Sequence, residues 1–390
     1  MEDQSSSRSS ANNNTISEFF ENYWDIIGGA LLSIAAYFAH QNHNIYLTTI
    51  FTAFAIGSLS ITVSEIAEIL AERLGEPLGS YILTITAVLV EIVLLFNVMV
   101  EAAHNPSAID TVKGGIVSAV IVDMNVLLGL AVFIGGLAFT EQQHNEDTSS
   151  TYTTILYVSA LALLVPSILS NTNHTEETLK EVSLIIGILL FSFYIVILIF
   201  QTKTHTHFFK STARSRIFRF RRKLRENEED EENENYIFEK LPTIINFFCI
   251  FILIFVIGIL AELFAHDGLS VAKIHGISTG IAGLVIAVIS VAPEIFTAIK
   301  AAKNDQIQRV VNIAMGASTV SILLTVPALL LLSLIFDINL TLGFNALEIG
   351  ALIFTIILAW KTTDDGETNY FEGISHLMLF LCYAVIAAYY

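Results

Sequence analysis

The chain has 390 residues, of which 54% are hydrophobic and only 14% are charged, and its formal net charge is −18. Soluble domains carry about 25% charged residues, so this composition excludes an ordinary soluble protein and predicts that lipid surrounds most of the chain. A strongly acidic chain is also repelled by phosphate backbones, which excludes nucleic acid as a partner.

The chain begins with a polar stretch, residues 1–20, whose serine- and asparagine-rich composition predicts a disordered tail. Eleven apolar segments follow. A helix that spans the membrane needs about 20 residues, so the first and fifth segments are short, while several others are long enough to tilt or break. In chain order we expect these segments at 24–39, 45–70, 80–102, 112–139, 154–169, 179–200, 241–264, 274–301, 307–336, 343–360 and 370–390.

Positive charge sets the expected orientation of these segments. Ten of the 19 Lys and Arg residues lie between Lys203 and Lys240, and positive residues favour the cytoplasmic side of a membrane. We therefore expect the loop at 202–240 in the cytoplasm, with the N-terminus on the same side. The expected location is the plasma membrane, with the lipid bilayer as the partner of a multi-pass protein.

The loop at 202–240 is basic in its first half and acidic in its second half, where seven acidic residues lie between Glu226 and Glu234. Blocks of like charge are typical of solvated, mobile tethers. The alternative interpretation is a cytoplasmic strip that attracts cations, and the sequence leaves both open.

The same loop divides the chain into two candidate repeats, 45–201 and 241–390, which follow an extra first helix at 24–39. Each repeat holds five expected spans, and an odd number places the two repeats in opposite orientations. Inverted repeats of this kind place a binding site near the middle of the membrane. The expected fold is therefore all-α, with about 11 transmembrane helices in two inverted five-helix repeats after the first helix.

Each repeat carries one glutamate deep in an apolar run, Glu91 in the third segment and Glu294 in the eighth. A charge at the bilayer centre costs about 2.5–3.5 kcal/mol even on lenient scales, so such a residue normally binds or carries something. Because Pro293 lacks a backbone N–H, we expect the helix to break there and to free carbonyl oxygens near Ile289 and Ser290. The plainer alternatives are a protonated structural Glu91 and a simple proline kink.

A hard cation such as Ca²⁺ takes six to eight oxygen ligands, more than two carboxylates supply. Polar side chains on neighbouring segments are candidates for the remainder, although serine and threonine also bond to the backbone of their own helix. The candidate supporting residues are Asp123, Asn125, Ser118, Ser290, Asn312, Ser318 and Thr319, with Thr84, Thr86 and Ser321 as further hydroxyls.

Three more acids, Glu65, Glu68 and Glu72, share one face at the inner end of the second segment. They predict either a cytoplasmic vestibule for cations or a solvated helix end. The sequence contains no His-Glu-x-x-His or Gly-x-Ser-x-Gly pattern, and Cys249 and Cys382 lie in apolar runs. We therefore expect neither an enzyme nor a resident cofactor.

Charge alone predicts how such a protein works. Two ionised carboxylates in a medium of low dielectric constant repel each other, so Glu91 and Glu294 need either protons or a cation. The pair cannot hold both at once, and this mutual exclusion couples the two flows in an antiporter. A passive cation channel is the alternative from another class, because it moves ions without a proton gradient.

Several motifs resemble the cation/proton exchangers of the Ca²⁺:cation antiporter superfamily, and most closely its bacterial calcium/proton antiporter branch. The resemblance runs from about residue 26 to residue 390. The stretch at 71–80 and Glu91 are similar to the entry of the first repeat, and the Ser-Val-Ala-Pro-Glu stretch at 290–294 is similar to the Pro-Glu motif of the second. The other matching positions are the stretch at 201–205, Gln308, Arg309, Asn312, Gly316, Ser318, Pro327 and the stretch at 365–373.

The resemblance implies eleven helices, an acidic stretch between the halves, and Glu91 and Glu294 as the site of the transported ion. It implies a Ca²⁺/H⁺ antiporter that exports cytosolic Ca²⁺, with Na⁺/H⁺ or K⁺/H⁺ exchange as the alternative. One difference separates the chain from the eukaryotic-type exchangers, which carry Gly-Asn before each glutamate and a glutamine in the second repeat. Here the residues are Ala87-Val88, Ser290-Val291 and Val320.

Overall fold

The computed structural model describes residues 23–74, 78–170, 175–210 and 236–389, with the side chains of 78–81, 83 and 84 left out. Within these residues, ten helices are long and apolar enough to cross a membrane, and a further helix covers residues 23–41. This confirms the expected all-α class and agrees with the expected eleven helices. The tail at 1–20 and the charged blocks at 211–235 lie outside the described residues.

The helix at 23–41 is followed by helices and two short strands. They are α2 (Ile45–Leu74), α3 (Leu78–Val100), η1 (Glu101–Ala103), α4 (Ala108–Ile121), η2 (Val122–Leu127), α5 (Leu128–Phe139), β1 (Glu141–Gln143), α6 (Glu146–Ser170), α7 (Glu176–Ile199), η3 (Phe200–Thr204), η4 (Thr206–Phe209), α9 (Ile237–Lys240), α10 (Thr243–His275), α11 (Thr279–Lys303), α12 (Ile307–Val320), η5 (Ser321–Thr325), α13 (Val326–Ile335), α14 (Ala346–Thr363), β2 (Glu367–Asn369) and α15 (Tyr370–Tyr389). Three of the short elements, η2, η3 and η5, are π-helical turns.

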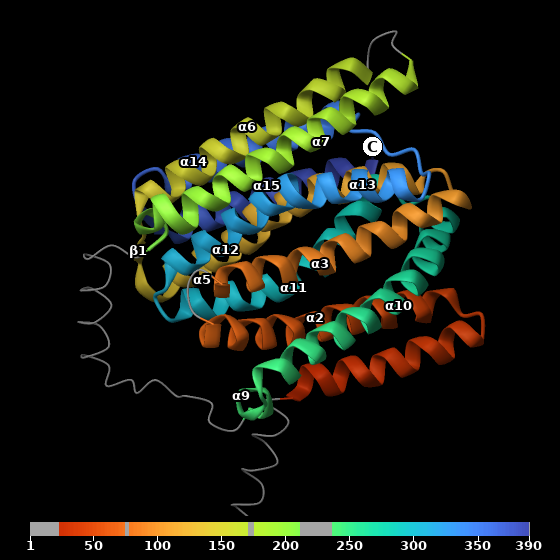
Figure 1. The fold of residues 1–390 in the computed structure, drawn as a ribbon, viewed down its shortest axis with the longest axis horizontal. Coiled ribbons are helices and arrows are strands. Elements are labelled where there is room, and N and C mark those ends of the chain that lie inside the picture. Colours follow the sequence, from red (N-terminus) through yellow and green to blue (C-terminus); the bar gives the residue numbers. More distant parts are fainter. Residues whose placement is uncertain (1–22, 75–77, 171–174, 211–235, 390) are drawn as a thin grey trace, which may run out of the picture.

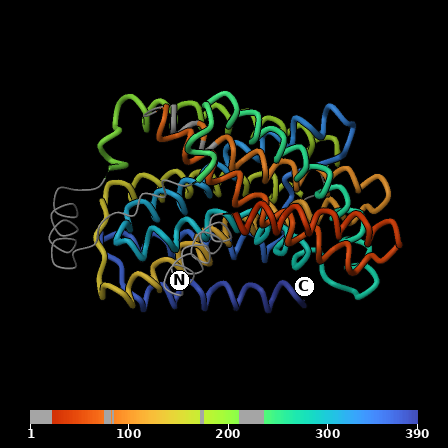
Figure 2. The backbone as a smooth tube through the Cα atoms, turned by 90° about the horizontal axis from the view of Figure 1, so that it is seen from below, coloured from red at the N-terminus to blue at the C-terminus, as the bar shows by residue number. Residues whose placement is uncertain are grey.

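The helices lie side by side in one bundle, with the helix at 23–41, α2 and α10 gathered along one side (Figure 1). The view turned by 90° shows the C-terminal helix α15 along an edge of the bundle (Figure 2). One end of the bundle carries β1, β2 and α9 and is called the loop end here. The other end carries η1 and is called the opposite end.

The outer surface of the bundle is apolar where α7 and α10 face away from it. Phe251 is 71% exposed and Ile188 is 67% exposed, and many other large apolar side chains are exposed beside them. A soluble protein rarely exposes so many contiguous apolar side chains, because water would favour burying them. This surface therefore fits lipid as the solvent of the bundle.

The turn between α10 and α11 corrects two expected boundaries. Helix α10 runs on to His275, well past the expected end at residue 264, and α11 begins only at Thr279. Gly276 ends α10 in the left-handed conformation, at φ +64°, and the Ser278 hydroxyl accepts a hydrogen bond from the N–H of Ile281 to begin α11. The charged residues between 262 and 267 therefore belong to the last turns of a helix.

A two-stranded antiparallel sheet at the loop end was not expected in an all-α protein. Strand β1 pairs with β2, with Gln142 opposite Thr368. The Gln142 side chain also donates to the carbonyl oxygen of Ala302, at the end of α11. The strands thus join the connection after α5 to the connection after α14.

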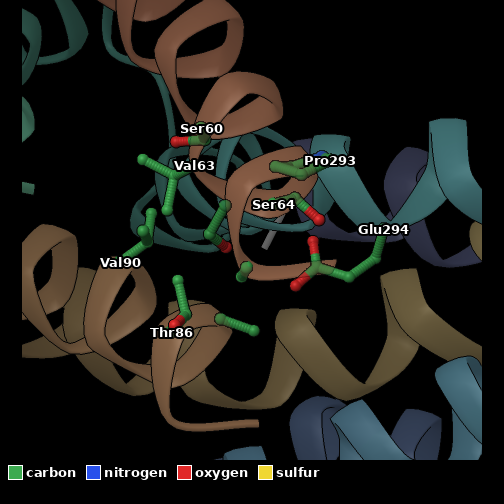
Figure 3. A pocket seen from close by; sticks show the side chains of 10 residues that line it. Ser60, Val63, Ser64, Thr86, Val90, Pro293 and Glu294 are labelled. Carbon is green, nitrogen blue, oxygen red and sulfur yellow. The ribbon is translucent and has the colours of Figure 1, made fainter. Parts of the chain in front are cut away.

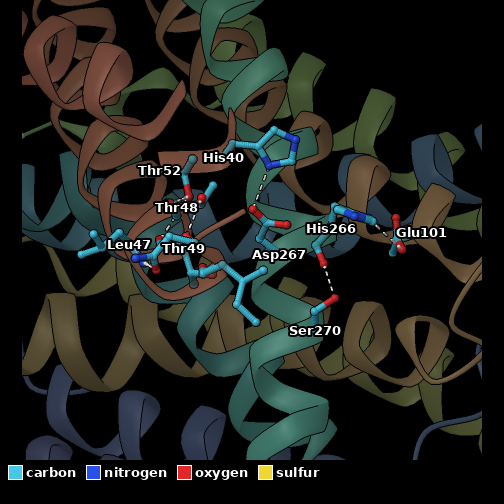
Figure 4. Close-up of polar contacts among 11 residues, drawn as sticks. His40, Leu47, Thr48, Thr49, Thr52, Glu101, His266, Asp267 and Ser270 are labelled. Carbon is cyan, nitrogen blue, oxygen red and sulfur yellow. Dashed lines mark hydrogen bonds and ion pairs between the residues drawn. The ribbon is translucent and has the colours of Figure 1, made fainter. Parts of the chain in front are cut away.

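At the opposite end, histidines and carboxylates connect three helices (Figure 4). His40 lies 2.9 Å from the Asp267 carboxylate and so joins the helix at 23–41 to α10. His266 of α10 lies 3.5 Å from Glu101 of η1. These contacts hold the side of the bundle that contains α10 against α3 and its extension.

Candidate cation site

Three acidic side chains line one cavity of ≈ 30 Å³. Glu91 comes from α3, Asp123 from the π-helical turn η2, and Glu294 from α11. The structure therefore brings the two glutamates to one place, inside the bundle and away from its lipid-facing surface. The cavity is lined by Ala87, Val88, Glu91, Asp123, Ser290, Val291, Glu294, Ala317 and Ser321.

Glycine packing lets α11 carry Glu294 close to the helix that leads to Asp123. A Cβ atom added at Gly283 of α11 would lie 2.5 Å from the backbone nitrogen of Gly115 and 2.6 Å from the carbonyl carbon of Gly114. Only a residue without a side chain fits at that position, because real Cβ contacts are never so short. The sequence therefore fixes the close approach of α4 and α11 through small residues.

Hydroxyl groups from α12 and η5 hold two of the three acids. Ser321 and Thr325 each donate a hydrogen bond of 2.9 Å to Oε2 of Glu91. Ser318 donates a hydrogen bond of 3.1 Å to Oδ2 of Asp123. Glu91 is only 8% exposed and Asp123 only 1%. Because both donors to Glu91 lie in the second repeat, these bonds cross from one repeat to the other.

Each acid keeps one buried oxygen without a hydrogen-bond partner among the described residues: Oε1 of Glu91, Oδ1 of Asp123 and Oε2 of Glu294. Buried polar atoms are nearly always hydrogen-bonded, so three such oxygens around one cavity are unusual. A hard cation or protons would satisfy them, since both prefer carboxylate oxygen. In the described part of the chain, no group of three or more His, Cys, Asp or Glu side chains lies close enough together to hold a metal ion as it stands.

A second cavity, of ≈ 20 Å³, adjoins Glu294 on the side of α2. Figure 3 shows the Glu294 carboxylate extending into it, beside Ser64 and Pro293. Ser60 and Thr86 add hydroxyls to the same lining, and the hydroxyl oxygen of Ser60 has no hydrogen-bond partner among the described residues. Glu294 therefore borders two cavities, and the second one is partly polar.

The expected break at Pro293 is wrong. Helix α11 continues without interruption from Thr279 to Lys303, with Pro293 inside it. Proline removes only the hydrogen bond to the carbonyl four residues earlier, and packing against neighbouring helices lets a membrane helix continue through it. The irregular backbone lies instead at the π-helical turns η2 and η5, which hold Asp123 and the hydroxyl donors to Glu91.

Four expected supporting residues point elsewhere. Ser118 contacts the Tyr383 hydroxyl at 3.1 Å, and Asn125 bonds to Thr355 and His376. Thr319 donates to the carbonyl of Met315 in its own helix, and Asn312 donates to the carbonyl of Phe209. Of the expected supporting residues, Asp123 lines the cavity with the two glutamates, Ser318 bonds to Asp123, and Ser290 lines both cavities. The four residues above do not bond to any of the three acids. The side chain of Thr84 lies outside the described residues.

The three acids of the expected vestibule are not equivalent. Tyr236, just before α9, donates a hydrogen bond of 2.7 Å to Glu65, and burial raises the pKa of Tyr236 so that it stays a donor. Glu68 forms an ion pair with Arg309 of α12, whereas Glu72 is exposed. Two of the three acids are therefore engaged by partners at the loop end.

The sequence did not single out two polar residues that form buried hydrogen bonds in the structure. Thr325 was not among the expected supporting residues, although it bonds to Glu91. Asp25, in the helix at 23–41, is buried and accepts a hydrogen bond from Thr62 of α2. Asp25 could have been found from the sequence, because it is a single acidic residue inside the short first apolar segment.

The model of the sodium/calcium exchanger protein family matches residues 43–203 and 245–389, well over half of the chain. The chain belongs to the sodium/calcium exchanger protein family. The match falls in two parts, one on each side of the central loop, as expected for two repeats. The resemblance to cation/proton exchangers is thereby confirmed, and the chain is a multi-pass membrane protein of a transporter family.

Two relatives cover most of the chain. The chain is 27% identical over 333 residues to the sodium-potassium/proton antiporter ChaA of Escherichia coli (strain K12). The match covers 84% of this chain and 86% of the relative. It is 25% identical over 350 residues to a Ca(2+)/H(+) antiporter of Aphanothece halophytica. This match covers 88% of this chain and 89% of the relative.

Two solved structures share the fold of this member of the exchanger family. The structure of native YfkE matches with a TM-score of 0.76 at 19% identity, covering 94% of this chain and 100% of that one. The structure of the H+/Ca2+ exchanger CAX matches with a TM-score of 0.68 at 15% identity, covering 95% and 92%. These likenesses show that the arrangement of helices is that of membrane exchangers.

Proposed function

We propose that this protein is a Ca²⁺/H⁺ antiporter of the plasma membrane that exports cytosolic Ca²⁺ in exchange for protons. The observation that carries the proposal is the cavity that Glu91, Asp123 and Glu294 line together, each with one buried oxygen that has no hydrogen-bond partner among the described residues. Membership of the sodium/calcium exchanger protein family and the likeness to a Ca(2+)/H(+) antiporter support it.

The charges around the cavity account for the exchange. With no cation bound, ionised carboxylates in a medium of low dielectric constant repel one another, so protons must neutralise part of that charge. A divalent cation replaces those protons, because it binds the same oxygens. The carboxylates hold either the cation or the protons, and neither flow proceeds without the other.

Access to the site completes the proposed cycle. The cavity beside α2 gives Glu294 a partly polar neighbour in the direction of Ser60 and Ser64. A rocking motion of one repeat against the other would expose the carboxylates to each side of the membrane in turn. The hydrogen bonds from Ser321 and Thr325 to Glu91 cross between the repeats, so they lie where that motion takes place.

Exchange of Na⁺ or K⁺ for protons is the second candidate. The likeness to the sodium-potassium/proton antiporter of Escherichia coli favours it, at an identity similar to that of the calcium relative. The polar groups in the lining of the cavity are carboxylates and hydroxyls, whose oxygens suit every one of these cations. The supply of three carboxylates favours a divalent cation, because two positive charges neutralise more of the acidic cavity.

Transport in proteoliposomes tests the proposal. A pH gradient is imposed, Ca²⁺, Na⁺, K⁺ or Mg²⁺ is added separately, and proton release is followed. We expect Ca²⁺ to drive proton release, and we expect Glu91→Gln and Glu294→Gln each to abolish it. Glu262→Gln is the matched control, because Glu262 lies exposed on α10. Full exchange by both site variants would overturn the assignment, and cation flux without proton movement would indicate a channel.

A further inference from the structure

Three hydroxyl side chains form a stripe along one face of α12 and η5. Ser318, Ser321 and Thr325 are spaced at i, i+3 and i+7, a spacing that places side chains on one side of a helix. Each of them donates its hydroxyl to an acid of the first repeat. We call Ser318, Ser321 and Thr325 the hydroxyl stripe.

The stripe bonds to one oxygen of each carboxylate and leaves the other without a partner among the described residues. Both donors to Glu91 bond to its Oε2, and its Oε1 is the buried oxygen without a partner. Asp123 shows the same division, because Ser318 bonds to Oδ2 and leaves Oδ1 without a partner. The two acids are thus each held by one oxygen while the other stays available to a cation.

The two repeats differ in this feature. Ser321 and Thr325 follow Glu294 by 27 and 31 residues, and the same spacings from Glu91 lead to Ser118 and Val122. Val122 has no hydroxyl, and Ser118 is engaged with Tyr383. Among the described residues, no side-chain hydroxyl is found bonded to the Glu294 carboxylate, and its Oε2 lacks a partner. Within the part of the chain that the structure describes, the arrangement that holds Glu91 therefore has no counterpart around Glu294.

We propose that the hydroxyl stripe consists of positioning residues, which fix Glu91 and Asp123 as preset cation ligands and leave Glu294 as the ligand that adjusts. The inference rests on the proposed function. A carboxylate that is already held in place loses less conformational freedom when a cation arrives, so the affinity for the cation is higher. Removing a hydroxyl of the stripe should therefore weaken cation binding more than it slows turnover.

The test uses the full chain in proteoliposomes and measures the Ca²⁺ concentration that gives half-maximal proton release. Thr325→Val keeps the shape of the side chain but removes the hydroxyl, and Ser321→Ala removes the second donor. We expect each to raise the half-saturating concentration about tenfold, as for loss of a hydrogen bond to a charged group, with a maximal rate within about twofold of the unsubstituted protein. Thr325→Ser retains a hydroxyl and should restore near-normal binding.

Ser118→Ala is the matched control, because Ser118 occupies the position equivalent to Ser321 but contacts Tyr383. It should leave the half-saturating concentration unchanged. The inference is overturned if Thr325→Val and Ser321→Ala bind Ca²⁺ normally, or if Ser118→Ala or Thr325→Ser impairs binding as strongly as they do. If the unsubstituted protein releases no protons on Ca²⁺ addition, Na⁺ replaces Ca²⁺ as the probe, and failure with every cation contradicts the proposed function instead.

A melting curve of each purified variant in detergent separates binding from folding. A variant of the stripe that melts at the temperature of the unsubstituted protein, yet needs more Ca²⁺, supports a positioning role. A rise in half-saturating concentration that appears only together with a lower melting temperature would mean that the stripe acts by holding the helices together, and the inference fails.

Discussion

Ser318 of α12 donates a hydrogen bond to Asp123 of the π-helical turn η2, and the bond links the second half of the chain to the first. Asp123 is almost fully buried and lines the cavity that Glu91 and Glu294 also line. A buried charge is costly unless it is paired, and a single hydroxyl does not neutralise it. We therefore predict that Asp123 helps to bind the cation proposed for this cavity.

Replacing Asp123 with asparagine tests that role. The amide has the same shape and can still accept from Ser318, but it removes one negative charge and offers one oxygen in place of two. We expect the Ca²⁺ concentration for half-maximal exchange to rise at least tenfold, or about 1.4 kcal/mol in binding free energy. Proton release from proteoliposomes during Ca²⁺ titration measures this change.

Asp337→Asn is the control for that substitution, because Asp337 is exposed and lies in the connection after α13. Its backbone has φ 54°, a conformation that asparagine adopts readily, so the fold should be unaffected. If Asp123→Asn and Asp337→Asn need the same Ca²⁺ concentration for half-maximal exchange, Asp123 is a structural acid and takes no part in the cation site.

Close packing at Gly283 gives a second prediction. Alanine at this position places a methyl group 2.5 Å from the Gly115 backbone nitrogen, so α11 must move away from α4. Overpacking of this kind typically costs about 1–3 kcal/mol. We expect Gly283→Ala to lower the melting temperature of the purified protein and to reduce exchange, because α11 carries Glu294.

Gly350 provides the comparison for Gly283. A Cβ atom added at Gly350 of α14 meets nothing within 4 Å. Alanine is favoured over glycine inside a helix by roughly 0.5–1 kcal/mol, so Gly350→Ala should leave the melting temperature unchanged or raise it slightly. If both substitutions change the melting temperature equally, α4 and α11 tolerate a wider separation.

The positions of Glu91 and Glu294 could be predicted because a single charge in a long apolar run is a local pattern. The partners that the supporting side chains contact could not be predicted. Ser118 and Ser321 stand at the same spacing from their glutamates, yet one contacts Tyr383 and the other Glu91. Which neighbour a hydroxyl meets depends on the packing of distant helices, and the sequence around the hydroxyl does not encode it.

The backbone shows the same division between local and distant causes. The chemistry of proline predicts a break at Pro293, but α11 packs against neighbouring helices and continues through it. The π-helical turns carry no comparable signal, since η5 contains ordinary residues such as Ser321 and Thr325. These turns follow from the way the helices meet around the acids.

His144 gives a prediction for the pH dependence of stability. This histidine lies between β1 and α6, outside the spanning helices, and is only 4% exposed. Burial lowers its pKa from 6.5 to about 4, because the charged imidazolium would be separated from water. As the pH falls below 6.5, the unfolded chain takes up a proton at His144 while the folded chain does not. Folding therefore loses stability between pH 6.5 and pH 4.

Within that range the loss from one such group is about 1.4 kcal/mol per pH unit, and above pH 6.5 the group contributes no slope. Glutamine at position 144 does not titrate, so His144→Gln should lower the melting temperature at pH 7 through its lost contacts with Ser149 and Thr363. The melting temperature of the His144→Gln variant should then fall less than that of the unsubstituted protein between pH 7 and pH 5. Melting curves of both purified proteins at the two pH values measure the difference, and parallel losses would show that folding does not shift the pKa of His144.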